Sequence, residues 1–482
     1  MTSTEPVFEF PLDLATVAAT GRTRALHEAL REAILDRRLR AGAELPSTRR
    51  VATAYGLARN TVIAAYDLLV AEGYVITRAG AKAIVADVAT RPATRAPRLA
   101  DGHLRTRWQA PSWSSAVASD DAWTSNFRLG VPDHREIPFD VWRRLLSRAF
   151  HPRNGGAFAY QPPHGRPRLR EAIAGHVSFA RAVACRAEDV IVTSGARQAF
   201  ALLARLLVTP GRTVVAVEDP GYPTAGAAMA AAGADVVPVP VDDEGLRVDA
   251  LPREARVVYV TPSHQYPTGV AMSMARRRAL LDFARERDAL IIEDDYDGEF
   301  RYGARPLDAL QTLDRDGRVV YVGTFSKSLF PSLRVGYVVA PEWLRDALGA
   351  AKEGADTCGN AQVQDALADF ILEGHLARHV RRMRRVYAGR RAALFEMLDG
   401  PLSRWLSAIP SEAGIHVAAR FVDAEAADEL LPRVREHAMG AMPLRALSRR
   451  EDGVCGVAFG LGCVGEGEIR ERLAALGKVL RR

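Results

Sequence analysis

The sequence predicts a two-domain α/β protein, in which a small basic helical domain precedes a large domain built on a mostly parallel sheet. The chain has 482 residues, and at ~100–200 residues per domain this length requires at least two domains. Beyond about residue 123, apolar strand-like runs alternate with helical stretches, which is typical of a parallel sheet covered by helices on both faces. Residues 20–88 instead show three helical segments followed by two short strands.

The composition is that of a globular protein, with 48% hydrophobic and 26% charged residues. No long uncharged apolar run occurs, and the first residues lack a basic segment followed by an apolar one, so we expect neither a membrane span nor a secretory signal. The cysteines form no CxxC pair, and the eleven histidines show no metal-ligand spacing. We therefore expect a cytoplasmic protein without a metal site, with free thiols at Cys185, Cys358, Cys455 and Cys463.

The positive charge is concentrated near the N-terminus. The formal net charge is +7. Residues 20–88 hold eleven Lys and Arg against seven Asp and Glu, and residues 89–110 hold five Arg against one Asp. Such a basic balance permits a polyanionic partner. Residues 90–119 are rich in Pro, Ser and Thr without apolar periodicity, which predicts a flexible linker over 89–122 between domains at 20–88 and 123–482.

Three helices and a hairpin are expected in the small domain. Apolar residues at helical spacing predict a first helix over Thr23–Leu39. A second helix fits Ser47–Tyr55, with Ser47 as its N-cap and Gly56 as its end. A third runs from about Ala58 to Ala71. The following stretch YVITRAGAKAIVA predicts two short strands whose tip carries Arg78 and Lys82.

The string LPSTRxVAxxYGxxRNTV and its flanks resemble the GntR-type winged helix-turn-helix over nearly all of residues 20–88. The third helix exposes its N-terminal end, the part that a recognition helix presents to base edges. By this resemblance, the residues expected to face double-stranded promoter DNA are Ser47, Arg49, Arg59, Asn60, Thr61 and the wing residue Lys82. The competing interpretation is a helical module whose charges are merely solvated.

In the large domain, the string GTFSKSLFPSLRVG spans residues 323–336. Lys327 follows a serine directly after an apolar strand, and Arg334 comes seven residues later. A lysine so placed can form a Schiff base with a cofactor aldehyde while the arginine holds a phosphate dianion. A solvated surface lysine is the alternative for Lys327 taken alone.

Three further strand ends agree with this chemistry. Asp294 ends an apolar strand and shares a face with Tyr296, so its carboxylate can keep a pyridine nitrogen protonated. The loop Ser194–Arg197 opens a helix after the strand VIVT and offers backbone N–H groups to a phosphate. Ser326 can add a hydroxyl, and Tyr222 follows another strand, where it can stack on the ring.

Together these motifs resemble a fold type I aminotransferase, and specifically the aminotransferase-like half of the MocR subfamily of GntR regulators, over residues 123–482. The resemblance implies pyridoxal 5'-phosphate as cofactor and Lys327 as its Schiff-base lysine. It also implies a homodimer in which Tyr160 reaches the phosphate of the neighbouring subunit. The other cofactor contacts that it implies are Asp294 and Tyr296 at the ring nitrogen and ring oxygen, Tyr222 stacked on the ring, and Arg334, Ser326, Ala196 and Arg197 at the phosphate.

Two positions depart from the aminotransferase pattern. Tyr266 occupies the place of the asparagine in Asn-Pro-Thr-Gly, which contacts the ring oxygen. Ala458 stands where an arginine normally binds the substrate carboxylate, and losing that contact removes about 1.5–3 kcal/mol per hydrogen bond. Either Arg445 or, less favourably, Arg420 replaces this arginine, or the ligand has no such carboxylate.

The sequence therefore predicts a transcriptional regulator that binds promoter DNA and senses pyridoxal phosphate or a small amine, with vitamin B6 or amino-compound metabolism as its expected target. An active aminotransferase with an accessory DNA-binding module is one alternative. Another is a constitutive DNA-binding protein that uses the large domain only to dimerise. The arginine-rich run from Arg378 to Arg391 is interpreted either as a second DNA-facing stripe or as a solvated helix face.

Overall fold

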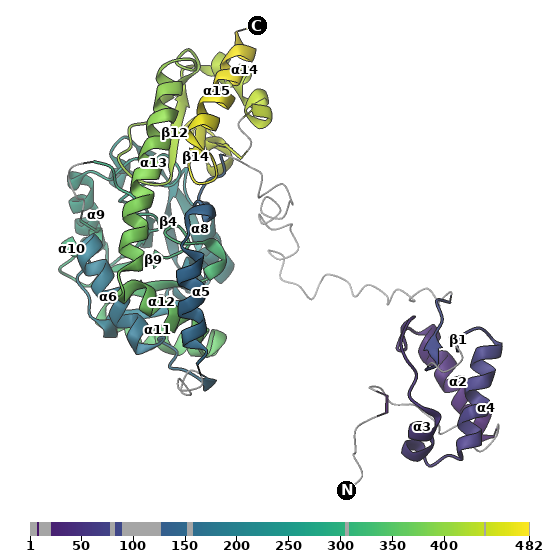
Figure 1. The fold of residues 1–482 in the computed structure, drawn as a ribbon. Coiled ribbons are helices and arrows are strands. Elements are labelled where there is room, and N and C mark those ends of the chain that lie inside the picture. The colour runs from purple at the N-terminus through teal and green to yellow at the C-terminus, as the bar shows by residue number, and fades with distance from the viewer. Residues whose placement is uncertain are drawn as a thin grey trace. The chain divides into compact units, whose positions relative to one another are not determined.

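The computed structural model describes residues 7–8, 21–77, 82–88, 127–151, 158–303, 308–437 and 440–481 (Figure 1). The chain forms two compact units that divide between Ala110 and Pro111. This division falls within the range expected for the linker, although the linker residues and Arg78 lie outside the described residues. Among the described residues, no helix is long and apolar enough to span a bilayer.

The small unit is a winged helix-turn-helix, as predicted. Its two strands pair antiparallel, with Val75 opposite Val85. The helices enclose a buried core that includes Leu26, Val62 and Leu69. The elements are α2 (Arg22–Leu35), α3 (Thr48–Tyr55), α4 (Arg59–Ala71), β1 (Val75–Ile76) and β2 (Ile84–Val85).

The first helix is shorter than predicted. It ends at Leu35 rather than Leu39, because Arg37 adopts a left-handed conformation with φ 61° that turns the chain out of the helix. Leu39 is nevertheless buried in the core. It is therefore apolar because it packs there, and not because it belongs to the helix. The limits of α3 follow the prediction, since the Ser47 hydroxyl accepts a hydrogen bond from the backbone N–H of Arg50 and Gly56 ends the helix in a left-handed conformation.

The large unit is built on an eight-stranded sheet in the order β3-β10-β9-β8-β7-β4-β5-β6. Strands β9, β8, β7, β4 and β5 run parallel, whereas β10 is antiparallel to both of its neighbours. The apolar runs of the sequence are therefore buried strands of a mostly parallel sheet, as predicted. Their bounds are β3 (Val190–Thr193), β4 (Val214–Asp219), β5 (Asp235–Asp242), β6 (Gly245–Leu246), β7 (Ala255–Val260), β8 (Leu290–Asp295), β9 (Val319–Thr324) and β10 (Gly336–Val339).

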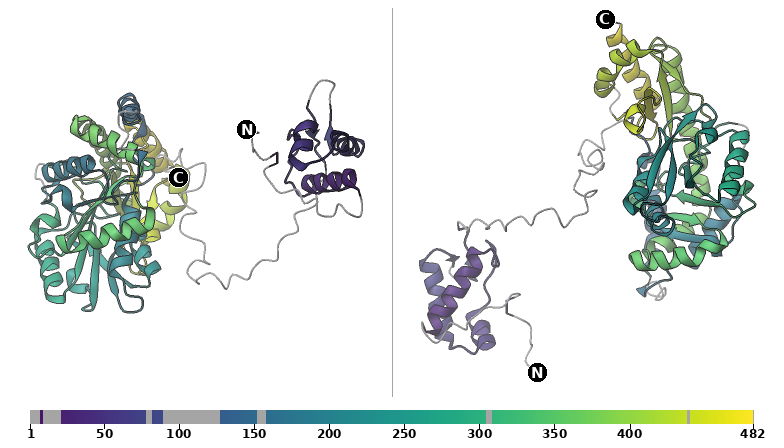
Figure 2. Two further views of the ribbon diagram at one scale, coloured as in Figure 1. Left: turned by 90° about the horizontal axis from the view of Figure 1, so that it is seen from below. Right: turned by 180° about the vertical axis from the view of Figure 1, so that it is seen from behind.

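Helices surround this sheet in every view (Figures 1 and 2). They are α5 (Phe139–Ala149), α6 (Pro167–Arg181), α7 (Ala196–Leu207), α8 (Pro223–Ala232), α9 (Met274–Arg287), α10 (Leu310–Leu313), α11 (Glu342–Asp356), α12 (Ala361–Leu372) and α13 (His375–Asp399). Short 3-10 helices occur at His134–Glu136, Ala187–Asp189, Val248–Ala250, Pro331–Leu333 and Leu444–Leu447.

A second, four-stranded antiparallel sheet closes the C-terminal end of the large unit, in the order β11-β12-β14-β13. The long helix α13 runs from the large sheet towards this smaller one (Figure 1). The C-terminal elements are β11 (Leu406–Ala408), β12 (His416–Phe421), α14 (Ala424–His437), β13 (Met442–Pro443), β14 (Gly456–Gly460) and α15 (Glu466–Leu480).

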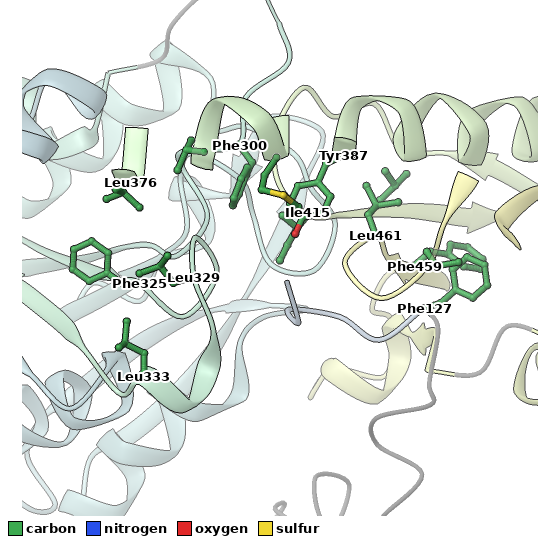
Figure 3. Packing of buried hydrophobic residues seen from close by; sticks show 14 of the residues in the cluster. Phe127, Phe300, Phe325, Leu329, Leu333, Leu376, Tyr387, Ile415, Phe459 and Leu461 are labelled. Carbon is green, nitrogen blue, oxygen red and sulfur yellow. The ribbon is translucent and has the colours of Figure 1, made fainter. Parts of the chain in front are cut away.

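One hydrophobic cluster joins the two sheets (Figure 3). Within it, Phe127 packs edge-to-face on Phe459 of β14, with ring centroids 5.7 Å apart. Phe300, which follows β8, packs in the same way on Tyr387 of α13 at 5.2 Å. Each such pair contributes about 0.5–1.5 kcal/mol beyond its buried area. The shared core fixes the small sheet against the ends of the large one, where the polar residues gather.

Candidate functional site

Polar residues follow the strands of the large sheet at the edge where the parallel strands end. Asp294 lies near the end of β8, Lys327 follows β9, and Ser194 follows β3. In open α/β sheets, ligands bind at the carboxyl ends of the strands. The topology thus brings together residues that are more than 130 positions apart in sequence.

The amine of Lys327 lies close to Gly130, in the segment that precedes α5. Its Nζ donates to the carbonyl oxygen of Gly130 at 2.5 Å. Desolvation lowers the pKa of Lys327, and the charges of Arg197 and Arg128 lower it further, against the opposing effects of Asp297 and Asp294. This environment favours the neutral amine, which is the nucleophilic form.

Asp294 is a buried carboxylate with one free oxygen. Its Oδ2 accepts a hydrogen bond of 2.7 Å from the hydroxyl of Tyr259, whereas Oδ1 is buried without a hydrogen-bond partner in the part of the chain that the structure describes. Burial raises the pKa of Asp294 to about 7, although Tyr259 and Lys327 act in the opposite direction. A buried acceptor without a partner is costly, so Oδ1 provides a place for an N–H donor.

The alternation predicted along β8 is confirmed by its other acidic residues. Asp295 receives a hydrogen bond of 2.6 Å from Arg181 and another of 2.6 Å from Tyr321. Glu293 accepts the backbone N–H groups of residues 310 and 311. These two carboxylates are satisfied within the fold, which leaves Asp294 for another partner.

The loop after β3 is shaped by Arg334. Its guanidinium donates to the carbonyl oxygen of Ser194 at 2.5 Å. Gly195 has φ 82°, and a Cβ at this position would lie 2.8 Å from the Arg334 guanidinium, so a glycine is required. Ala196 begins α7, and Arg197 in its first turn is exposed. Exposed cations beside the N-terminus of a helix suit a phosphate.

Ser326 directly follows β9 and already takes part in hydrogen bonds. Its hydroxyl oxygen accepts from the hydroxyl of Thr324 at 3.0 Å, and its backbone N–H donates to the same hydroxyl. The side chain is buried. Its own proton remains for an acceptor such as a phosphate oxygen.

A buried lysine that the sequence did not single out supports the same loop. Lys352 of α11 is 1% exposed and donates to Asp356 Oδ1 at 2.6 Å. Asp356 Oδ2 accepts from Gln198 at 2.7 Å, and Gln198 Oε1 accepts the backbone N–H of Ser194 at 2.7 Å. This chain of hydrogen bonds fixes Ser194 from the side opposite to Arg334. Only the spacing of Lys352 and Asp356, one helical turn apart, hints at it in sequence.

Aromatic side chains form the next part of the site. Tyr222 and Tyr266 pack edge-to-face with ring centroids 5.4 Å apart, and Tyr266 packs on Tyr296 at 6.0 Å. Burial raises the pKa of Tyr266 and of Tyr296, so both hydroxyls stay protonated at neutral pH. The structure therefore brings the three predicted tyrosines into one cluster.

Behind Tyr296 lies a buried polar group that was also missed. The Tyr296 hydroxyl is 2.9 Å from Nδ1 of His264, and the two carboxylate oxygens of Asp297 are 3.2 and 3.1 Å from the same nitrogen. Ligand atoms of His264, Asp297 and His416 lie within 4.8 Å of one another. Asp297 contacts Nδ1 of His264, so a metal would have to bind Nε2 on the other side of the ring. Asp297 would not reach a metal there. The geometry therefore favours a hydrogen-bonded network over a metal site.

Arg420 and Arg445, the two candidates to replace the arginine that is missing at position 458, already bind other groups. Arg420 forms an ion pair with Asp243, and Arg445 donates to the backbone oxygen of Glu451. Ala458 is fully buried in an apolar cluster with Val270, Ile409, Ala418 and Leu444. The structure thus gives the predicted position of the missing arginine an apolar environment.

Tyr160 projects away from the unit, with 89% of its surface exposed. Such exposure is unusual for an aromatic side chain. It takes no part in the site of its own chain, and its predicted role across a subunit boundary stays a prediction.

The arginine-rich run forms the middle of α13. Most of its members have partners within the large unit: Arg382 pairs with Glu136, Arg384 donates to the carbonyl oxygen of residue 299, and Arg390 pairs with Asp133. Arg391 lies 4.4 Å from the ring centroid of Phe395. These contacts favour a structural role for the run.

In the small unit, Arg49, Arg59 and Asn60 are exposed, while Thr61 is half-buried at the start of α4. Ser47 is exposed as well, although its hydroxyl caps α3. Lys82 forms an ion pair of 2.6 Å with Glu44, so phosphate contact by this wing residue would compete with that pair. The predicted DNA-facing residues therefore lie around the N-terminal ends of α3 and α4 and on the wing.

Comparisons with known proteins agree with both units. Residues 22–85 match the family of bacterial regulatory proteins of the gntR family, and residues 124–444 match aminotransferase class I and II. The probable rhizopine catabolism regulatory protein MocR of Rhizobium meliloti is 40% identical over 422 residues, covering 86% of this chain and 84% of that protein. The pyridoxine biosynthesis transcriptional regulator PdxR of Corynebacterium glutamicum is 33% identical over 408 residues, covering 85% of each chain.

Among solved structures, the kynurenine aminotransferase of Pyrococcus horikoshii is similar with a TM-score of 0.71 and 27% identity, covering 78% of this chain and 96% of that one. The matches to MocR and PdxR cover more of this chain than the large unit contains, so they extend into the small unit. The chain therefore belongs to the MocR-type transcriptional regulators, in which a GntR winged helix precedes an aminotransferase class I and II domain.

Proposed function

We propose that this chain binds pyridoxal 5'-phosphate on Lys327 and uses it to sense a small amine, or the cofactor itself, while its winged helix binds promoter DNA. The observation that carries this proposal is the free, buried Oδ1 of Asp294 at the same sheet edge as Lys327, whose pKa is lowered by desolvation. A protonated pyridine nitrogen supplies the N–H donor that this oxygen lacks.

The rest of the site fits the same group. The cradle formed by Gly195 and Arg334 suits a phosphate, because a guanidinium and helix N–H groups meet there. Tyr222 belongs to the aromatic cluster with Tyr266 and would stack on the cofactor ring. When bound, pyridoxal phosphate supplies an aldehyde that condenses with amines and a ring that withdraws electrons.

Each residue has a defined task in this scheme. Lys327 holds the cofactor covalently through its neutral amine, whose pKa is lowered by desolvation. Asp294 holds the proton of the ring nitrogen. Arg334, Arg197, Ser326 and the N–H of Ala196 bind the phosphate. Tyr266 and Tyr296 line the side of the ring oxygen.

The effector is either pyridoxal phosphate itself or an amine that lacks the carboxylate which an arginine at position 458 would bind. The apolar surroundings of Ala458 and the engagement of Arg420 and Arg445 support this choice. The relatives named for rhizopine catabolism and pyridoxine biosynthesis are consistent with control of amino-compound or vitamin B6 metabolism.

We further propose a cytoplasmic homodimer, in which Tyr160 contributes to the neighbouring site. The 89% exposure of this side chain leaves it available to a partner subunit. Two winged helices on one dimer would bind two half-sites, and their linkage raises the effective concentration of the second head.

An active aminotransferase with an accessory DNA-binding module is the second candidate, favoured by Asp294 and Lys327 and opposed by Tyr266 and Ala458. Steady turnover of an amino donor and a keto acid at ordinary enzyme rates, ~1–1000 per second, would support it. A constitutive DNA-binding protein would instead develop no visible absorption with the cofactor.

Borohydride reduction of the reconstituted protein, followed by peptide mass spectrometry, tests the proposed site. We expect the cofactor mass on the peptide that contains Lys327 and no visible band in the Lys327→Ala variant. Lys478→Ala, which changes an exposed lysine of α15, is the matched control and should reconstitute normally. Cofactor mass on another lysine would overturn the assignment.

A further inference from the structure

Tyr296, His264 and Asp297 form a buried line of polar side chains behind the site. The exposed fractions of the three residues are 8%, 2% and 1%. The Tyr296 hydroxyl meets Nδ1 of His264 at 2.9 Å, and Asp297 meets the same nitrogen at 3.1 Å. Asp297 also accepts the backbone N–H of Ile415 at 3.2 Å, which anchors its carboxylate.

Asp297 determines which nitrogen of His264 carries the proton. A carboxylate only accepts hydrogen bonds, so the nitrogen that faces it must be the N–H. Nε2 of His264 is buried without a hydrogen-bond partner among the described residues. A proton on Nε2 would therefore leave a buried donor unsatisfied and turn the lone pair of Nδ1 towards the carboxylate. Both effects favour the Nδ1–H form.

The tautomer in turn sets the role of Tyr296. When Nδ1 carries the proton that Asp297 accepts, this nitrogen has no lone pair for the Tyr296 hydroxyl, so Tyr296 cannot donate to His264. Burial raises the pKa of Tyr296, so the hydroxyl keeps its own proton. That proton is left for an acceptor other than His264.

We propose that Asp297 and His264 are positioning residues that fix Tyr296 as a hydrogen-bond donor to the ligand of the site. Given the proposed function, on which this inference rests, the acceptor is the ring oxygen of pyridoxal phosphate. The chain needs such a donor because Tyr266 replaces the asparagine amide that serves this oxygen in the aminotransferase pattern. The arrangement parallels the way in which an aspartate sets the histidine tautomer in a catalytic triad.

Other titratable groups face the same region and act in both the parent and its variants. The ring of His416 lies 4.5 Å from that of His264, and burial together with His264 lowers the pKa of His416 to about 3, so it stays neutral. The remaining groups with an electrostatic effect on Tyr296 are Tyr266, Asp294 and Glu218.

Nitrogen-15 NMR of the cofactor-free protein tests the tautomer directly. With ¹⁵N-labelled histidine, and the signal assigned by its loss in His264→Gln, we expect His264 to carry its proton on Nδ1. Asp297→Asn should move the equilibrium towards Nε2–H. A parent protein with the Nε2–H form would overturn the proposal, and this result does not depend on cofactor binding.

The pH titration of the visible band of the reconstituted protein tests the consequence for the ligand. Asp297→Asn should raise the apparent pKa of the band by about one unit. When the hydrogen bond to the ring oxygen weakens, this oxygen keeps more negative charge, and the Lys327 nitrogen beside it binds its proton more tightly. Mere loss of the negative charge of Asp297 has the opposite sign, since that charge raises the pKa of Lys327. The direction of the change therefore separates positioning from simple electrostatics.

A double-mutant cycle completes the test. Tyr296→Phe should raise the pKa of the band as Asp297→Asn does, and adding Asp297→Asn to Tyr296→Phe should produce no further rise. Additive rises would overturn the relay. Asp314→Asn is the matched control, because Asp314 also accepts backbone N–H groups but precedes β9, at the opposite end of that strand from Lys327.

If Asp297→Asn fails to fold, judged by its thermal unfolding, the tautomer of His264 in the parent protein and the pKa of the band in Tyr296→Phe decide the proposal, and either an Nε2–H parent or an unchanged band would overturn it. Absence of a visible band in the parent protein would instead contradict the proposed function, while the tautomer result would still stand.

Discussion

Asp294 is a case in which a buried position prepares a single carboxylate for its proposed binding role. The residue differs from its neighbours on β8 only by the face on which it lies, yet Asp295 is satisfied by Arg181 and Asp294 keeps one oxygen free. Burial raises the pKa of Asp294 from 3.8 to about 7. The cofactor-free protein therefore binds a proton there that its unfolded chain releases near pH 4.

This difference predicts how Asp294→Asn changes stability with pH. Between about pH 4 and 7 the unfolded chain ionises first, so the free energy of unfolding of the parent falls as the pH rises through this window. The variant lacks this loss. We expect the cofactor-free variant to gain stability over the parent by at most about 4 kcal/mol at pH 8, and by little at pH 4.

Urea unfolding of both cofactor-free proteins at the two pH values measures the effect. Glu293, whose pKa burial also raises to about 7, is common to both proteins and cancels in the difference. Glu218 responds in part to the substitution, because the charge of Asp294 adds to the rise that burial causes in the pKa of Glu218. A stability gap that is the same at both pH values would contradict the assignment to Asp294.

Substitution of Arg59 tests the predicted DNA-binding surface with a single side chain. It is exposed in the first turn of α4, the end that a recognition helix presents to DNA. We expect Arg59→Ala to weaken operator binding about 5- to 150-fold, corresponding to the loss of ~1–3 kcal/mol for one base or phosphate contact. Fluorescence anisotropy with labelled operator DNA measures this.

Arg24→Ala is the matched control, because Arg24 is 69% exposed on α2 and paired with Glu28. It should bind operator DNA as the parent does. Both variants should also reconstitute with the cofactor normally. Equal DNA affinity of Arg59→Ala and the parent would remove Arg59 from the interface.

At the scale of the element, helix α11 supports the loop after β3 (Ser194–Arg197), the proposed phosphate site, through Lys352. Replacing it by Met keeps the apolar stem but leaves Asp356 without its buried cation, so Gln198 and Ser194 lose their support. We expect Lys352→Met to lower the affinity for pyridoxal phosphate about tenfold, or ~1.4 kcal/mol. Equilibrium titration of the visible band measures it.

Lys352→Arg retains the charge and should recover part of the affinity. Lys478→Met provides a control on an exposed lysine of α15. A Lys352→Met protein that unfolds at a lower temperature but binds the cofactor with unchanged affinity would show that Lys352 stabilises α11 without positioning the loop.

The sequence predicts the elements that have strong local signals. The apolar runs became strands β3, β4, β7, β8, β9 and β10, and the cap residues Ser47 and Gly56 set the limits of α3. The end of α2 was misplaced because Leu39 continues the apolar pattern past the left-handed turn at Arg37. Periodicity reports which residues are buried, but not where the backbone leaves the helix.

The candidate site was predictable only in part. Lys327, Asp294 and Arg334 follow strands in recognisable strings, and the structure brings their strand ends to one sheet edge. Tyr259 and His264 act through partners that are distant in sequence, and Lys352 pairs with Asp356 on what looks like an ordinary helix. No local pattern therefore distinguishes these three residues. Hydrogen-bond networks of this kind become visible only when the sheet order is known.

At the scale of the whole molecule, two units on one chain link a ligand site to a DNA-binding module. A ligand changes DNA binding only if it binds differently to the two states of the protein, and the coupling is reciprocal. Operator DNA should therefore change the affinity for the cofactor or effector by the same factor by which the ligand changes the affinity for DNA.

The most direct test is a single titration of cofactor-free protein with pyridoxal phosphate, in which visible absorption and operator binding are recorded in the same sample for the parent and Lys327→Ala. We expect the parent to develop colour and to change its operator affinity over the same range of ligand concentration. Lys327→Ala should remain folded and bind operator DNA, but show neither response. A Lys327→Ala protein whose operator affinity responds like that of the parent would contradict the account.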